Sequence, residues 1–350
     1  MTPNTETNSR REKSADATLI RTPWCTLTGV QILATGSYAP AAKLTNAQLA
    51  ALGCDEEWIV QRTGIRERRV ASPQEATSDL AREAALRCLQ NAQLTPRDID
   101  LILVCTMTPD FQTPSTACLL QHQLGATCGA IDINAACSGF MYGLVTAAQF
   151  VRTGVYRRVL VVGAEVMSRT VDPTDLKTVP LFGDGAGAVI VGAGEASQGL
   201  LSFNLGSDGS GECLLKIPGG GSREPITGET LTTRRQYMFM EGKPVFKWAV
   251  RLVSEALLGA LEKAGVTSDD VSLVLLHQAN ARILDAVVKE VGLSSEKVLM
   301  NLDRYGNTSA GSIPLALDEA YRTGRIQPGS RILLCGFGAG LAWGTALLQW

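Results

Sequence analysis

The most informative stretch of the chain is Ile131-Asp132-Ile133-Asn134-Ala135-Ala136-Cys137-Ser138-Gly139-Phe140, which sets one cysteine between a strand and a helix. The segment before Cys137 is apolar and strand-like, and residues 140–152 carry apolar side chains at helical spacing up to Gly154. Cys137 should therefore lie at a helix N-terminus, where free N–H groups and the helix dipole favour negative charge. We expect a lowered thiol pKa and a nucleophilic Cys137. The alternative is a buried structural cysteine.

Composition is typical of an enzyme-sized globular chain. Of 350 residues, 45% are hydrophobic and 19% charged, and the 35 glycines suit an α/β fold with short turns. The net charge of −2 counts against nucleic acid as a partner, and no apolar run is long enough to cross a membrane. Nine cysteines without Cys-x-x-Cys spacing argue against disulfides or structural zinc, so we expect a cytoplasmic protein. Residues 1–24 predict a disordered polar tail rather than a secretory signal.

The chain repeats itself, and the repeat predicts two similar halves. Residues 91–103 and 263–275 share a helix end, a threonine-containing turn, an aspartate and a buried strand, at an offset of 172. Residues 152–154 and 322–324 both read Arg-Thr-Gly, at an offset of 170. A duplication of this length indicates two packed α/β halves rather than a solenoid. The halves are expected at residues 25–195 and 196–350.

The offset of 170 links the cysteine to an asparagine in the second half. It maps Cys137 onto Asn307, which lies among small polar residues just before a predicted helix. We expect the two residues at equivalent strand-to-helix junctions, facing each other across a pseudo-two-fold axis. The alternative is that Asn307 only caps its helix, a common role for asparagine.

His277 is the third candidate for the site. It follows residues 271–276, an apolar run that predicts a buried parallel strand, and ligands bind at the carboxyl ends of such strands. The only other histidine, His122, lies in a polar sequence typical of a helix surface. The alternative is a structural histidine whose hydrogen bonds are satisfied within the fold.

Seven motifs, in order along the chain, carry a family resemblance. They occupy residues 58–68, 135–140, 172–175, 182–188, 277–280, 306–309 and 338–344. On these motifs the chain resembles the β-ketoacyl-acyl-carrier-protein synthases of type III, within the thiolase-like condensing enzymes. The resemblance implies an α/β protein with a five-layered αβαβα fold made of two duplicated halves.

The resemblance also implies the reaction and its residues. The reaction is a decarboxylative Claisen condensation of an acyl-CoA primer with malonyl-acyl-carrier-protein, which initiates fatty acid synthesis. Cys137 would carry the acyl group, with an oxyanion hole made by the backbone N–H groups of Cys137 and Ala339. His277 and Asn307 would donate hydrogen bonds to the enolate left by decarboxylation. No metal or cofactor is implied, because the coenzyme A thioester is itself a substrate.

Binding residues follow from the resemblance by position. Trp58 and Arg62 would face the adenine-nucleotide end of coenzyme A. The pantetheine channel would be lined by Gly242, Phe246, Ala279 and Asn280. An acidic acyl carrier protein would dock at Gln278, Arg282 and Lys247, although Arg282 and Lys247 would also suit an ordinary solvated face.

Primer choice and assembly are further expectations from the resemblance. Thr113 stands where many members place a phenylalanine at the end of the acyl pocket, so we expect room for primers longer than acetyl. A homodimer is implied as well. Two other functions stay open: a related condensing or acyl-transfer enzyme of secondary metabolism, and a non-catalytic homologue. The second would be expected to have lost the nucleophile, whereas Cys137 is present.

Overall fold

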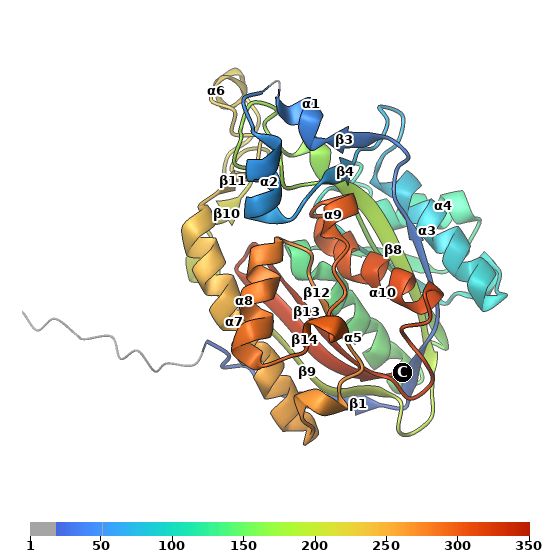
Figure 1. Cartoon of the computed structure of the whole chain (residues 1–350). Helices are drawn as coiled ribbons and strands as arrows, with labels where there is room; N and C mark the ends of the chain where they lie inside the picture. Colours follow the sequence, from blue (N-terminus) through green and yellow to red (C-terminus); the bar gives the residue numbers. More distant parts are fainter. Residues whose placement is uncertain (1–18, 51) are drawn as a thin grey trace, which may run out of the picture.

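Two five-stranded sheets form the frame of the molecule, and the computed structural model describes residues 19–50 and 52–350 (Figure 1). The first sheet has the order β2 (Val30–Tyr38), β8 (Asp184–Ala193), β7 (Arg158–Val166), β5 (Leu101–Cys105), β6 (Gly129–Ile133). The second has the order β1 (Cys25–Thr28), β9 (Gly199–Ser207), β14 (Ala342–Gln349), β13 (Arg331–Gly338), β12 (Leu273–Leu276). Four consecutive strands of each sheet, β2-β8-β7-β5 and β9-β14-β13-β12, share one pattern in which two antiparallel pairings are followed by a parallel one.

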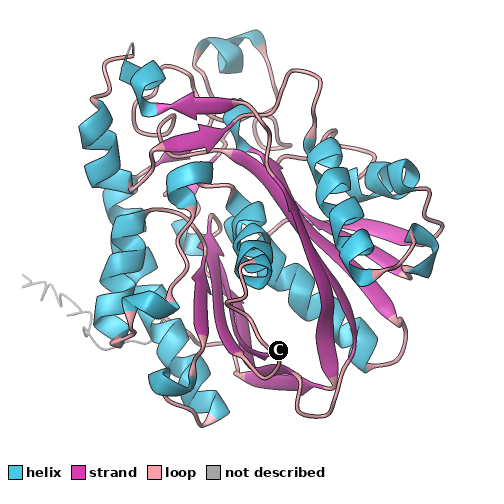
Figure 2. Ribbon diagram, turned by 45° about the vertical axis from the view of Figure 1, so that its right-hand side comes forward, coloured by secondary structure: helices cyan, strands magenta, loops and turns pink. Residues whose placement is uncertain are grey.

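Helices between and outside the sheets complete five layers (Figure 2). The middle layer holds α5 (Gly139–Arg152), which contacts strands of both sheets, and α10 (Ser312–Arg322), which contacts β2, β8 and β12. α3 (Thr77–Ala92) and α4 (Thr116–Leu124) cover the outer face of the first sheet. α7 (Gly242–Ala264), with α8 (Ala281–Val291) packed beside it, covers the second. This is the predicted αβαβα order of the thiolase-like fold.

The sequence of α5 explains its place in the middle layer. Nine of its fourteen residues are buried, so apolar side chains face both sheets rather than forming one stripe. Leu103 of β5, Leu144 of α5 and Leu334 of β13 belong to one core cluster that joins the halves. Gly143 lets α5 approach β5, because a Cβ at Gly143 would clash with the Cys105 sulfur.

The duplication holds, but the predicted pairing of Cys137 with Asn307 is wrong by three residues. A short 3₁₀ turn precedes each middle helix: η2 (Ala136–Ser138) before α5 and η7 (Ser309–Gly311) before α10, at an offset of 173. Cys137 therefore corresponds to Ala310. The offset returns to 170 at the helix ends because α5 has 14 residues and α10 has 11.

The beginning of the chain belongs to the second half, which corrects two predicted boundaries. β1, predicted within the half 25–195, pairs with β9 of the second sheet. Within the predicted tail 1–24, the backbone N–H groups of Leu19 and Ile20 donate to the carboxylate of Glu255 on α7. Both side chains also pack against the core of the second half. Residues 1–18 of that prediction lie outside the described residues.

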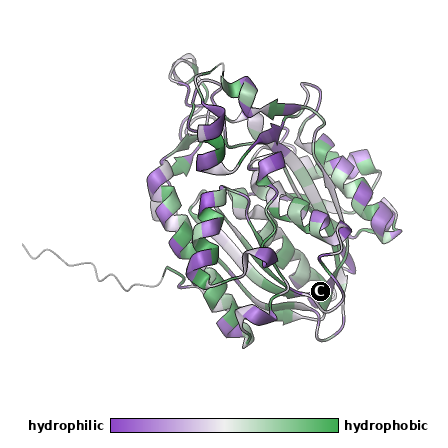
Figure 3. Ribbon diagram, in the orientation of Figure 1, coloured by the Kyte–Doolittle hydropathy of each residue, from purple (hydrophilic) through white to green (hydrophobic). Residues whose placement is uncertain are grey.

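Shorter elements lie above the two sheets in the view of Figure 1. They are β3 (Lys43–Thr45), α1 (Asn46–Ala50), α2 (Glu56–Thr63), β4 (Glu67–Arg69), β10 (Leu215–Lys216), α6 (Gly228–Thr232), β11 (Phe239–Met240) and α9 (Leu302–Tyr305). Single 3₁₀ turns complete the connections: η1 (Pro96–Asp98), η3 (Met167–Arg169), η4 (Gly209–Gly211), η5 (Ser268–Asp270) and η6 (Ser295–Lys297). Hydrophobic residues concentrate on the sheets and the helices between them (Figure 3). No helix in the described ranges has the length and apolar character of a membrane span.

Candidate active site

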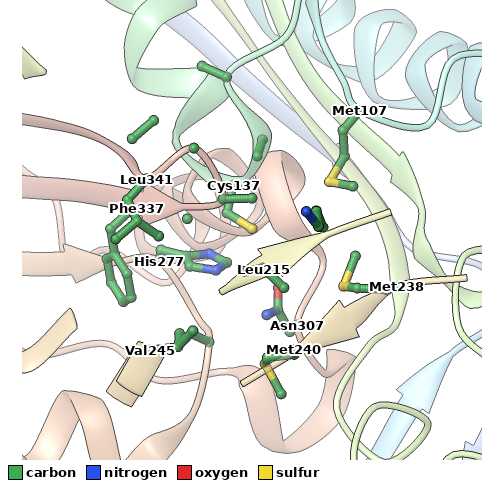
Figure 4. A pocket seen from close by; sticks show the side chains of 18 of the residues that line it. Met107, Cys137, Leu215, Met238, Met240, Val245, His277, Asn307, Phe337 and Leu341 are labelled. Atoms are coloured by element: carbon green, nitrogen blue, oxygen red, sulfur yellow. The ribbon is translucent and has the colours of Figure 1, made fainter. Parts of the chain in front are cut away.

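A cavity of about 870 Å³ lies where the two halves meet (Figure 4). Cys137, His277 and Asn307 all line it, as the sequence analysis predicted for a shared site. The first half contributes Met107 and Ile133 to the wall, together with a stretch around Cys137. The second half contributes the ends of β12 and β13, the start of α7 and the β10–β11 hairpin.

Cys137 sits in η2, immediately before α5, and is 6% exposed. Burial raises the pKa of its thiol to about 11, and the nearby charge of Glu165 acts in the same direction. The Ser309 hydroxyl, 3.4 Å from Cys137 Sγ, donates a hydrogen bond to the thiolate form, which lowers the pKa by a smaller amount. The predicted lowering of the thiol pKa is therefore wrong in direction, because removal from water outweighs the charged-form stabilisation available at the turn.

The end of β13 lies directly against the cysteine. A Cβ built on Gly338 would stand 2.8 Å from Cys137 Cβ and 3.1 Å from Cys137 N, so only glycine leaves room here. Ala339 follows and lines the cavity beside Cys137. The backbone groups predicted for the oxyanion hole thus come from neighbouring parts of one wall.

His277 lies just beyond β12 and is held in a neutral state. Its backbone N–H donates to the Cys335 carbonyl at 2.8 Å, which continues the β12–β13 pairing by one residue. Its Nδ1 is 2.8 Å from the Ser312 hydroxyl, so Nε2 remains for the cavity, and the Phe337 ring lies edge-on at 5.2 Å. Burial lowers the pKa of the imidazole to about 3. The ring therefore carries no charge at neutral pH.

Asn307 is fixed by backbone bonds to the opposite half. Its N–H donates to the Leu181 carbonyl at 2.8 Å, and its carbonyl accepts from Gly183 N–H at 3.0 Å. Its side-chain Oδ1 accepts from the N–H of Ser309 at 2.9 Å. This bond occupies the acceptor end of the amide and leaves the Nδ2 donor for the cavity.

Several predicted binding residues line the same cavity, namely Gly242, Phe246, Ala279 and Asn280. The Arg282 guanidinium lies over the Phe246 ring at 5.8 Å. Asn280 Nδ2 donates to the Arg62 carbonyl at 3.1 Å, and the Arg62 guanidinium lies 5.8 Å from the Trp58 ring centre. Trp58 and Arg62 are exposed on α2 and adjoin the cavity through Asn280 rather than lining it.

Two predicted residues need correction. Gln278 is 1% exposed: its Nε2 donates to the carbonyls of Leu276 and Leu299, and its Oε1 accepts from Asn301 N–H. A side chain used in this way cannot meet a docking protein, whereas Arg282 and Lys247 are exposed. Thr113 is also exposed, in the loop between β5 and α4, and it does not line the cavity of its own chain.

Sequence reasoning missed four polar residues around the site. Asn134 lines the cavity, Ser312 contacts His277, and Ser309 bridges Cys137 to Glu165. Glu165 had a signal in the sequence, since it is the only charged residue inside the apolar stretch 159–166. No cluster of three or more His, Cys, Asp or Glu side chains that could hold a metal is found in the described part of the chain.

A duplicated five-layered fold with cysteine, histidine and asparagine in one central cavity defines a thiolase-like condensing enzyme. Comparison with known proteins narrows this class. Family models described as 3-oxoacyl-[acyl-carrier-protein] synthase III match residues 131–209 and, for the C-terminal part, residues 261–350. The chain belongs to the β-ketoacyl-[acyl-carrier-protein] synthase III family, whose members are acyltransferases.

Individual relatives support this assignment over nearly the whole chain. The β-ketoacyl-[acyl-carrier-protein] synthase III of Rhodopirellula baltica is 56% identical over 342 residues, covering 93% of this chain and 99% of the relative. The solved 3-oxoacyl-[acyl-carrier-protein] synthase III of Aquifex aeolicus has a TM-score of 0.86 at 44% identity, covering 92% of this chain and all of that one. A priming β-ketosynthase from a polyketide pathway has a TM-score of 0.85 at 36% identity, covering 95% and 98%.

Proposed function

We propose that Cys137, His277 and Asn307 perform the family's condensation of an acyl-CoA primer with malonyl-acyl-carrier-protein, which starts fatty acid synthesis. The main support for this proposal is that the three residues line one cavity, where the first half supplies the nucleophile and the second half supplies the two hydrogen-bond donors. The relative from Rhodopirellula baltica is named β-ketoacyl-[acyl-carrier-protein] synthase III and is 56% identical, whereas the ketosynthase of a polyketide pathway is 36% identical, which favours this function over a role in secondary metabolism.

In the first half-reaction Cys137 Sγ attacks the thioester carbonyl of the primer. The negative charge that forms on the carbonyl oxygen would be met by the backbone N–H groups of Cys137 and Ala339. One such donor is worth about 3–4 kcal/mol of transition-state stabilisation. Coenzyme A then leaves, and the acyl group stays on Cys137.

In the second half-reaction malonyl thioester loses carbon dioxide and becomes an enolate that attacks the acyl group. The enolate oxygen needs neutral donors, because a strong acid would protonate it. Asn307 Nδ2 is one such donor. The other is His277 Nε2, which carries the ring proton when the Ser312 hydroxyl donates to Nδ1. The lowered pKa of His277 supports this neutral form.

Substrate delivery is assigned to the cavity entrance. Phe246, Ala279 and Asn280 would contact the pantetheine arm, while Trp58 and Arg62 would hold the nucleotide end of coenzyme A outside. The exposed cations Lys247 and Arg282, on neighbouring helices α7 and α8, would meet an acidic acyl carrier protein.

We also propose a cytoplasmic homodimer. β6 is the outer strand of the first sheet and leaves Ile131 48% exposed, and Phe111, in the loop between β5 and α4, is 58% exposed. An open strand edge beside exposed apolar side chains favours pairing with a second copy. Thr113 would then reach an acyl pocket only across this interface. Light scattering on the purified protein tests the dimer, and a monomer at micromolar concentration would contradict it.

Intact-mass analysis after incubation with a graded series of acyl-CoA thioesters tests the central proposal. A single acyl adduct should form and map to the peptide containing Cys137. Addition of malonyl-acyl-carrier-protein should then remove the adduct and yield 3-oxoacyl-acyl-carrier-protein. An adduct on another cysteine, or no adduct from any acyl-CoA, would contradict the proposed function. Condensation only with a different acceptor would favour the secondary-metabolism alternative.

A further inference from the structure

A chain of hydrogen bonds leads from the reactive sulfur into the protein interior. Ser309 Oγ lies 3.4 Å from Cys137 Sγ and 3.0 Å from Glu165 Oε1. Because its hydroxyl carries a single proton, Ser309 accepts from the thiol while it donates to the carboxylate, and it donates to the sulfur once the sulfur is a thiolate. All three residues are buried, and Ser309 and Glu165 are fully so. They come from three elements, η2, η7 and β7, so the chain crosses the contact between the two halves.

The Ser309 hydroxyl is not needed for the turn that holds it. Ser309 has a backbone φ of +48°, and the equivalent residue in the first half, Ala136, has a φ of +47°. Both junctions therefore adopt the same left-handed conformation, which costs a non-glycine residue about 1–3 kcal/mol. Since alanine supports the turn in one half, the hydroxyl in the other half serves its contacts with Cys137 and Glu165.

Glu165 is a buried carboxylate surrounded by neutral donors. Its oxygens accept from the hydroxyls of Thr106 and Thr108 and from the backbone N–H groups of Met107 and Thr108. Two titratable groups face it, the thiols of Cys137 and of Cys105 on β5. On the neighbouring β8, the carboxylate of Asp184 is bonded instead to Ala71 and Ser168. Burial raises the pKa of Glu165 to about 7, so it can both take up and release a proton near neutral pH.

The Cys137 thiol needs a proton acceptor of this kind in order to become a nucleophile. With a pKa of about 11, only about one Cys137 in ten thousand would be a thiolate at pH 7. His277, with a pKa of about 3, is a poor acceptor for the thiol proton.

Resting on the proposed function, we infer that Ser309 and Glu165 form a proton relay that takes the Cys137 proton during acyl loading and returns it after condensation. As the sulfur–carbon bond forms, the thiol proton moves to Ser309 Oγ while the Ser309 proton moves to ionised Glu165. The bond from the acyl carbon to the coenzyme A sulfur breaks, and coenzyme A leaves as a thiolate that takes a proton from water.

The second half-reaction resets the relay. The enolate carbon bonds to the acyl carbon, and the bond from that carbon to Cys137 Sγ breaks and leaves a thiolate. Glu165 then returns its proton through Ser309 to this thiolate. One proton from water is consumed per turnover, which balances the neutral coenzyme A thiol that accumulates.

Acyl loading of the full chain, measured by quenched-flow mass analysis between pH 5.5 and 9, tests the relay. The wild-type loading rate should rise with pH through an inflection near 7. Ser309→Ala should slow loading on the order of 10²-fold and remove that inflection, and Glu165→Gln should do the same. Ser309→Thr, which keeps the hydroxyl, should restore both. Thr106→Val removes one donor to the carboxylate and should move the inflection to higher pH.

A second readout separates failure of the relay from failure of the proposed function. The rate at which iodoacetamide alkylates Cys137, mapped by peptide mass, also depends on removal of the thiol proton and needs no acyl-CoA. The same four variants should change its pH profile in the same way. A wild-type inflection that persists in Ser309→Ala by both measurements would overturn the relay, even if Glu165→Gln fails to fold. Wild-type protein that is alkylated with the predicted profile but takes no acyl group would overturn the proposed function alone.

Discussion

Asn134 and Asn307 hold equivalent positions in the two halves, and each side chain accepts a hydrogen bond from the backbone N–H two residues later. Asn134 Oδ1 accepts from Ala136 at 3.2 Å, and Asn307 Oδ1 accepts from Ser309 at 2.9 Å. Both residues line the central cavity. The same asparagine turn is therefore present in both halves, but only the turn in the first half is followed by the nucleophilic cysteine.

This relationship gives a matched pair of variants for the enolate donors. Asn307→Ala should slow malonyl decarboxylation on the order of 10²–10³-fold, because one donor to the enolate oxygen is lost. His277→Ala should have a similar effect, and acyl loading on Cys137 should stay measurable in both. Asn134→Ala removes the same kind of hydrogen bond within a turn but no enolate donor, so it measures how much of the lost decarboxylation rate comes from disturbing the turn. Equal falls of loading and decarboxylation would contradict the division of labour.

Cys137→Ala should abolish acyl loading while changing the free energy of unfolding by only about 1 kcal/mol, because one buried sulfur atom is removed. Intact mass after incubation with acyl-CoA and urea unfolding check the two parts. Cys88→Ala is the control, since it removes a buried thiol on α3 and should leave loading unchanged. Acyl transfer to the Cys137→Ala protein would identify a different nucleophile.

The pH dependence of stability should contain two opposed contributions. Glu165 has a folded pKa of about 7 against 4.5 for the free group, so its contribution favours folding below pH 4.5 and is lost as the pH rises through 7. His277 has a folded pKa of about 3 against 6.5, so its contribution is present above pH 6.5 and is lost as the pH falls towards 3. Each slope is at most about 1.4 kcal/mol per pH unit.

Between pH 4.5 and 6.5, single variants should separate the contributions of Glu165 and His277 to the free energy of unfolding. As the pH falls, wild type loses the His277 contribution, so His277→Gln should become more stable relative to wild type. Wild type gains the Glu165 contribution over the same range, so Glu165→Gln should become less stable relative to wild type. Urea unfolding at several pH values measures both differences. Variant curves that run parallel to the wild-type curve would show that neither group titrates as its burial indicates.

Lys247→Glu should raise the KM for malonyl-acyl-carrier-protein roughly tenfold with little change in kcat, because docking of an acidic carrier depends on exposed positive charge. The effect should shrink at high salt. Lys263→Glu, near the opposite end of the same helix α7, is the matched control and should leave KM unchanged. An equal effect of the two substitutions would point to overall charge rather than to a docking site.

Thr113→Phe should selectively depress loading of primers longer than acetyl, because an aromatic ring would fill space that threonine leaves open. Loading from acetyl-CoA by the same variant is the internal control. Since Thr113 does not line the cavity of its own chain, the effect should depend on the dimer. Wild-type protein that accepts only acetyl-CoA would refute this prediction at once.

The local signals around the nucleophile predicted the junction at Cys137 and its counterpart in the second half. A cysteine among small residues between a strand and a helix is a short-range pattern, and the structure has η2 and α5 in that place. The residue-to-residue correspondence of the two halves was not predictable from the repeated motifs. Because α5 is three residues longer than α10, the offset between the halves is 173 at the start of these helices and 170 at their ends.

Burial was harder to predict than position. The helix N-terminus suggested a low thiol pKa for Cys137, but that expectation ignored the surrounding layers that remove water from the sulfur. The family resemblance placed Gln278 at the surface where the carrier protein docks. The structure instead uses its amide to satisfy three backbone groups. Both errors have one cause, since sequence spacing carries little information about tertiary burial.

The pairing of β1 with β9, and of β9 with β14, determines when the two halves can fold during synthesis on the ribosome. Residues 25–28 are made early, but their sheet cannot be completed until residue 349 has left the ribosome, so the second half must assemble late. A nascent chain that has finished only its first half already carries Cys137. It still lacks His277, Asn307 and the wall around Ala339. Condensing activity is thus absent from every partial chain and arises together with the completed fold.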